Sequence, residues 1–106
     1  MSAIFVYITC EDAKEAGRIA EALLEEKLIA CANVFQPHQA IYHWQGKIQS
    51  EPETAMIVKT RHDLFEKVCS TVKNNHSYDV PCVVALPVTN GEKSFLDFIS
   101  QETSLQ

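Results

Sequence analysis

Two short polar stretches, residues 42–47 and 76–81, hold most of the side chains that could do chemistry. Tyrosine and tryptophan combine an apolar ring with a polar tip, so they are typical of interfaces and of ligand clefts. We expect Tyr42, Trp44 and Tyr78 either to anchor an interface or to line a binding cleft between subunits. Lys59 ends an apolar segment, and its ammonium either extends into solvent or points at an acid or an anionic ligand in that cleft.

His76 is the strongest candidate for metal ligation or proton transfer, because imidazole titrates near neutral pH and binds metal ions. It follows two asparagines and precedes an apolar segment. The alternative is therefore a helix-end histidine, whose charge is favourable at the carboxyl end of a helix. Cys10 is followed by the acids Glu11 and Asp12, which disfavour a thiolate. Cys10 is thus a weak candidate for a nucleophile.

The remaining motif search argues against an enzyme and against a zinc knuckle. No P-loop, G-x-G-x-x-G, H-E-x-x-H or G-x-S-x-G motif occurs, and no local motif supports a dyad of His76 with Cys10 or Cys82. We therefore expect no catalytic residues. The four cysteines include no C-x-x-C pair, and three stand in apolar runs. This pattern predicts small buried thiols in a reducing compartment, and with it a cytoplasmic protein.

Charge and length narrow the class further. The 106-residue chain has 9 Lys and Arg against 14 Asp and Glu, a net charge of −5. An acidic balance without a basic cluster argues against nucleic-acid and membrane partners. No apolar run approaches the ~20 residues of a membrane span, and the first residues lack the basic region of a secretory signal. The length predicts one domain over residues 1–106.

Hydrophobic periodicity predicts five strands and three helices. The strands are expected over residues 3–8, 28–35, 40–49, 54–60 and 80–88, and the helices over 12–27, 63–75 and 94–100. Residues 50–53 have the composition of a turn, and the polar tail 101–106 is expected to fray. The order predicts an α+β, ferredoxin-like βαββαβ fold with an antiparallel sheet, both main helices on one face, extended middle strands and a C-terminal helix.

Two details of this pattern bear on the site and on assembly. The pairs Asp12/Glu15 and Asp63/Glu66 have capping-box spacing, and Glu15 is expected on the polar face of its helix. Residues 4–8, 28–32 and 83–86 do not alternate, so they present apolar side chains on both sheet faces. Two helices cover one face, and a homo-oligomer would bury the other, at ~25 cal/mol per Å² of apolar area.

Four segments, LIACANV (28–34), IYHWQGKI (41–48), ETAMIVKT (53–60) and HSYDVP (76–81), resemble the CutA (CutA1) divalent-cation-tolerance family. The resemblance extends over residues 6–99. It implies a ferredoxin-like fold, a homotrimer in which long hairpins wrap neighbouring subunits, and a cytoplasmic protein linked to copper tolerance and to the response to metal ions. The same fold resembles PII signalling proteins, which gives an alternative: a small-molecule sensor with an intersubunit ligand cleft.

The resemblance also implies a metal-ligand set. The ligand positions suggested for metal-binding members correspond here to Ile8, Asn75 and His76, of which one is a strong ligand type. Cys10 lies two residues beyond Ile8 and projects from the same strand face if the strand continues. We therefore expect weak, poorly selective binding of Cu(II) or another divalent metal, dominated by His76 and assisted by Cys10.

Overall fold

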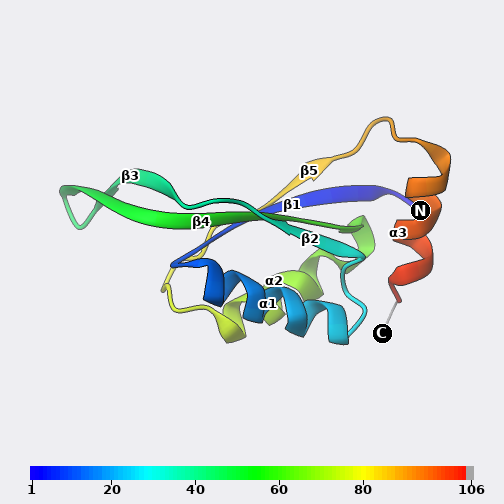
Figure 1. The fold of residues 1–106 in the computed structure, drawn as a ribbon, viewed down its shortest axis with the longest axis horizontal. Helices are drawn as coiled ribbons and strands as arrows, with labels where there is room; N and C mark the ends of the chain where they lie inside the picture. The colour runs from blue at the N-terminus through cyan, green and yellow to red at the C-terminus, as the bar shows by residue number, and fades with distance from the viewer. Residues whose placement is uncertain (105–106) are drawn as a thin grey trace.

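The computed structural model describes residues 1–104 and has the predicted α+β architecture (Figure 1). Its elements are β1 (Ala3–Cys10), α1 (Ala13–Glu25), β2 (Cys31–Val34), β3 (His38–Trp44), β4 (Lys47–Arg61), the 3₁₀ turn η1 (His62–Leu64), α2 (Phe65–Asn75), β5 (Val83–Pro87) and α3 (Lys93–Glu102). The antiparallel sheet has the order β2-β4-β1-β5, with β3 paired to β4. The ferredoxin-like prediction is confirmed. The end of the tail expected to fray, residues 105–106, lies outside the described residues.

The core lies between the sheet and helices α1 and α2, which pack on one of its faces (Figure 1). Strand side chains alternate, so the even-numbered residues of β1 and of residues 54–60 of β4 face these helices. They meet apolar helix positions that recur every three or four residues. The largest fully buried members of this cluster are Ile8, Ile19, Leu23, Ile29, Met56, Leu64, Val6, Val58, Val68 and Val72. Among residues 1–104, no helix is long and apolar enough to cross a membrane.

The two predicted capping boxes have different outcomes. At α1 the Asp12 carboxylate accepts the Glu15 N–H at 2.8 Å, as the sequence predicts. The prediction for α2 is wrong: this helix follows η1 and has no side-chain cap, while Asp63 pairs with Arg61 at 3.0 Å. The residue before α2, Leu64, is completely buried, so burial in the core fixes where this helix starts.

The extended hairpin of β3 and β4 is present, but the single strand predicted over residues 40–49 is wrong, because the hairpin turn divides it between Trp44 and Lys47. β4 is one 15-residue strand, and the turn expected at residues 50–53 is wrong. The first half of β4 pairs with β3 alone and forms a two-stranded ribbon that projects beyond the sheet (Figure 1). Pro52 is tolerated there because one edge of the ribbon strand has no strand partner. The chain reverses at Gln45 and Gly46, whose φ values of 52° and 80° suit a two-residue hairpin turn.

Candidate functional site

His76 is a buried histidine whose two ring nitrogens both have partners. It follows the last residue of α2 in extended conformation, and its side chain has no exposed surface. Nε2 lies 2.7 Å from the Thr9 carbonyl oxygen, and Nδ1 accepts the Tyr78 backbone N–H at 3.0 Å. A carbonyl oxygen only accepts and a backbone N–H only donates, so Nε2 carries the proton. The Nδ1 lone pair therefore accepts the Tyr78 N–H, and His76 joins the loop after α2 to the end of β1.

Glu15 is the second member of this buried group, although the sequence places it on the polar face of α1. It is 3% exposed. Its Oε1 accepts the Glu11 N–H at 2.9 Å and its Oε2 accepts the Ser77 N–H at 2.9 Å. Burial by itself raises the pKa of Glu15, but these hydrogen bonds and the nearby His76 outweigh burial and hold the pKa below the ordinary 4.5. The carboxylate therefore joins the β1–α1 turn to the α2–β5 loop as an anion.

Cys10 completes a cluster of three ligand types. β1 runs through Thr9 to Cys10, as the metal hypothesis requires, and the thiol is completely buried. One ligand atom each of Cys10, Glu15 and His76 lie within 4.8 Å of one another. Burial, followed by the charges of Glu15 and other acids, raises the pKa of Cys10 to about 12. The thiol is thus protonated at neutral pH, in agreement with its expected weakness as a nucleophile.

Thr54 adds an unpaired polar atom to the same region. It stands directly opposite Cys10 in the β1–β4 pairing, so the two side chains share the helix-facing side of the sheet. Thr54 is 1% exposed, and within residues 1–104 its Oγ1 has no hydrogen-bond partner. Unpaired buried hydroxyls are rare because they lose their bonds to water. The Thr54 hydroxyl therefore keeps an unused hydrogen-bonding capacity at this polar end of the core.

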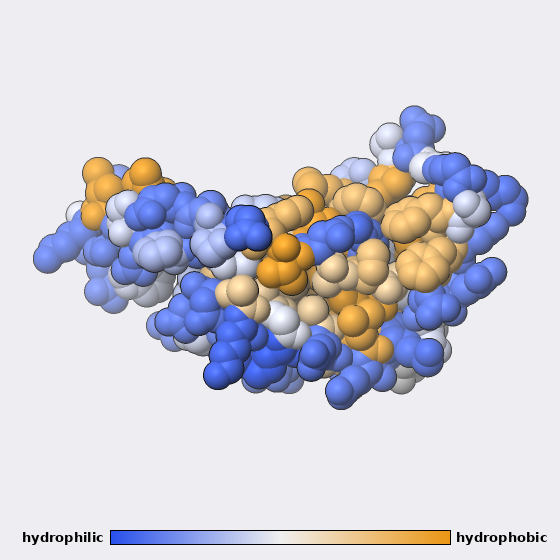
Figure 2. Space-filling model, in the orientation of Figure 1, coloured by the Kyte–Doolittle hydropathy of each residue, from blue (hydrophilic) through white to orange (hydrophobic). Residues whose placement is uncertain are grey.

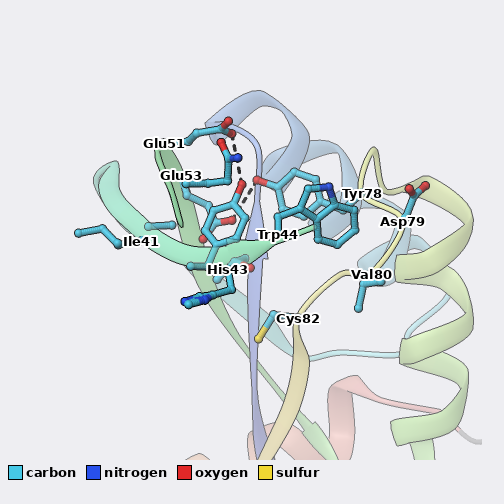
Figure 3. Close-up of a pocket in the computed structure, with 13 residues that line it drawn as sticks. Ile41, His43, Trp44, Glu51, Glu53, Tyr78, Asp79, Val80 and Cys82 are labelled. Atoms are coloured by element: carbon cyan, nitrogen blue, oxygen red, sulfur yellow. Dashed lines mark hydrogen bonds between the residues drawn. The ribbon is translucent and has the colours of Figure 1, made fainter. Parts of the chain in front are cut away.

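Outside this buried group lies a cleft between the β3–β4 ribbon and the segment after α2, which we name the hairpin cleft (Figure 3). Its volume is about 720 Å³, and its walls include three aromatic rings and three carboxylates. These are Tyr42, Trp44, Tyr78, Glu51, Glu53 and Asp79. The predicted cleft residues Tyr42, Trp44 and Tyr78 are thus brought together by the fold. Trp44 remains 43% exposed, so it is a ring of the cleft wall rather than of the core.

Lys59 does not lie in the hairpin cleft. It is directly opposite Phe5 in the sheet, and its ammonium donates to Asn33 Oδ1. Its Nζ is 5.5 Å from the centroid of the Phe5 ring and 5.9 Å from that of Phe95. The cation therefore belongs to the sheet face that α1 and α2 leave open, away from Glu53 and the other acids of the cleft.

Comparison with known proteins gives close relatives over nearly the whole length. The "Divalent-cation tolerance protein CutA" of Archaeoglobus fulgidus is 50% identical over 97 residues, which cover 92% of this chain and 94% of the relative. A solved structure of the CutA protein from that organism superposes with a TM-score of 0.92 at 48% identity, covering 94% of this chain and 97% of that one. "Protein CutA, chloroplastic" of Arabidopsis thaliana is 39% identical over 94% of this chain, which spans 55% of the plant protein.

These comparisons correct the predicted location. The Archaeoglobus structure is described as that of a periplasmic protein and the Arabidopsis relative as chloroplastic, so the cytoplasmic prediction is wrong. The physical reason lies in the use of the cysteines. All four are free thiols, and Cys10 is shielded by the core. A cysteine stays a free thiol wherever it is buried or lacks a second cysteine in bonding position. Free thiols therefore do not show that the surroundings are reducing.

The chain also matches a model built for a whole protein family. The model described as "CutA1 divalent ion tolerance protein" matches residues 4–102, which run from the second residue of β1 to the end of α3. The Archaeoglobus relative bears the name of a tolerance protein rather than of an enzyme. This chain belongs to the CutA1 divalent ion tolerance protein family.

Proposed function

We propose that this protein acts as a homotrimer that binds divalent metal ions weakly through Cys10, Glu15 and His76. The observation that carries the proposal is the convergence of a sulfur, a carboxylate oxygen and an imidazole nitrogen within 4.8 Å. Such a mixed set suits borderline ions such as Cu(II) and Zn(II). The unpaired Thr54 Oγ1 beside Cys10 is a further polar atom on the same side of the sheet.

The same geometry explains why the affinity should be weak. His76 would ligate through Nδ1, which carries the lone pair and lies 3.8 Å from Glu15 Oε1. That lone pair already accepts the Tyr78 N–H, and both Glu15 oxygens already accept backbone N–H groups. The Cys10 thiol must also lose a proton. A bound ion would neutralise the repulsion between thiolate and carboxylate, but it must first displace these hydrogen bonds.

A calorimetric titration with Cu(II) tests the assignment. We expect His76→Ala to weaken binding at least about tenfold, and binding to the wild type to fall on acidification as protons compete for the imidazole. His43→Ala is the matched control, because His43 is an exposed histidine on β3. The titration is run well below the unfolding midpoint of each variant. Tight, copper-selective binding that survives His76→Ala, or equal losses in both variants, contradicts the assignment.

The trimer is supported by the open face of the sheet, where apolar side chains are exposed. Val84 and Leu86 are 51% and 49% exposed, and they pair with Tyr7 and Phe5 on the face away from the core. Phe95 and other apolar residues of α3 extend this surface, and Figure 2 shows apolar side chains gathered beside that helix. A large contiguous apolar surface is typical of a subunit interface. Further copies of the chain would cover it.

Light scattering tests this assembly. We expect a mass of about 36 kDa, three times 11.9 kDa. Placing a charge in the open face by Leu86→Lys should shift the protein towards smaller species, because the ammonium would lose its hydration in the interface. Leu24→Lys is the control, since Leu24 is a partly exposed leucine on α1. A wild-type mass near 11.9 kDa, or a Leu86→Lys variant as large as the control, contradicts the trimer.

A further inference from the structure

The aromatic rings of the hairpin cleft come from two distant segments. Tyr42 and Trp44 lie on β3, whereas Tyr78 lies in the loop before β5 (Figure 3). His76 holds Tyr78 in place through two contacts. Its Nδ1 accepts the Tyr78 N–H, and the centroids of the two rings are 4.7 Å apart. The position of Tyr78 is thus set by the buried group, while its ring and hydroxyl face the cleft.

The phenols hold the cleft carboxylates in place. Tyr78 Oη donates to Glu53 Oε2 at 3.0 Å, and Tyr42 Oη donates to Glu51 Oε2 at 3.4 Å. In both pairs the phenol O–H is the donor and the carboxylate oxygen is the acceptor. Each carboxylate keeps further lone pairs for a ligand.

The charges of the cleft point to a cation. Its lining contains Glu51, Glu53 and Asp79, and no lysine or arginine among the described residues. An anionic ligand such as a nucleotide would meet three carboxylates, against which the described lining sets one imidazole, that of His43, and no lysine or arginine. A cation instead meets both these charges and the electron-rich ring faces, which attract ammonium groups.

The cation is organic rather than a bare metal ion. Among residues 1–104, the group of His, Cys, Asp and Glu residues close enough to hold a metal is the buried Cys10 cluster, and the cleft acids do not converge in that way. The cleft is also large, about 720 Å³, and partly apolar, which suits an alkyl-substituted ligand. We infer that the hairpin cleft binds an alkylammonium ion, with Trp44 and Tyr78 against its alkyl groups and Glu53 against its charge.

This inference goes beyond the proposed metal site, and a titration of metal-free protein in a chelator tests it separately. The probe is choline, and the readout is the emission of Trp44, the single tryptophan of the chain. We expect saturable quenching. 3,3-Dimethyl-1-butanol, which has the shape of choline without its charge, should bind at least about tenfold more weakly. ATP, which tests the opposite charge, should give no saturable change.

Two variants locate the binding. Glu53→Gln keeps an acceptor for Tyr78 but removes the charge, and we expect about a tenfold loss of choline affinity. Glu21→Gln makes the same charge change at an exposed position of α1 and should bind like the wild type. Trp44→Leu, followed by saturation transfer to the choline N-methyl protons, should weaken binding by about the same factor. Failure of choline to bind the trimer, equal binding of the neutral analogue, or an unchanged Glu53→Gln variant overturns the inference.

Discussion

Replacing Glu15 by alanine is expected to lower the free energy of unfolding by about 3 kcal/mol, because two backbone N–H groups lose their acceptor in a buried place. These are the N–H groups of Glu11 and Ser77. At one fixed protein concentration, the thermal midpoint should fall by more than about 10 °C. Glu21→Ala, on the exposed side of the same helix, should change it little.

The role of the Glu15 charge has its own pH signature. The pKa of Glu15 is lower in the folded chain than its ordinary 4.5, so the ionised carboxylate stabilises the fold above that pH. The stabilisation is lost as the pH falls through the folded-state pKa. The stability difference between the wild type and Glu15→Gln should therefore shrink below about pH 4.5. A difference that stays constant from pH 7 to pH 3 would show that the charge is not what stabilises this region.

Replacing His76 by alanine is expected to lower the free energy of unfolding by about 3 kcal/mol, the combined effect of a cavity and two lost hydrogen bonds. The Thr9 carbonyl and the Tyr78 N–H lose their buried partner. Because Tyr78 is then free to move, its amide hydrogen should exchange faster with solvent than in the wild type. Thermal unfolding and hydrogen exchange measure the two effects.

His76→Phe separates the two causes, since phenylalanine fills a similar volume without ring nitrogens. It should recover part of the stability lost in the alanine variant, but the Tyr78 amide should still exchange rapidly. His43→Ala should leave both quantities unchanged, because that side chain lies on the exposed ribbon. If His76→Phe protects the Tyr78 amide as well as the wild type does, packing alone holds the loop and the hydrogen-bond account fails.

The parts of the fold that follow from local pattern could be predicted from the sequence. The apolar stripe of α1, its Asp12 cap and the two-sided β1 are properties of neighbouring residues. The continuous β4 could not be predicted, because residues 50–53 have turn composition and their pairing with β3 is decided by the hairpin turn at Gln45 and Gly46. At residues 50–53, cross-strand hydrogen bonds to β3 outweigh the local preference for a turn.

The candidate site was only partly predictable for the same reason. Tyr42, Trp44, Tyr78 and His76 carry distinctive chemistry, and the fold brings them into two adjoining groups. The spacing of Asp12 and Glu15 predicts a helix cap but not the burial of the Glu15 carboxylate. That burial depends on a hydrogen bond from the Ser77 N–H, 62 residues away in the chain. Neither Thr54 nor Glu53 has a local signature. The sequence leaves Lys59 either in solvent or in the cleft, because its position opposite Phe5 is set by strand register and not by its own charge.

The metal site is tested most directly by ¹⁵N NMR of the histidine rings during titration with Zn(II), a diamagnetic ion of similar ligand preference. Ligation through Nδ1 should shift the His76 Nδ1 resonance and release the Tyr78 N–H that this atom now accepts. The exposed His43 should remain unshifted until higher Zn(II) concentrations. Zn(II) binding that leaves the His76 ring and the Tyr78 amide unchanged while His43 shifts would contradict a metal site at Cys10, Glu15 and His76.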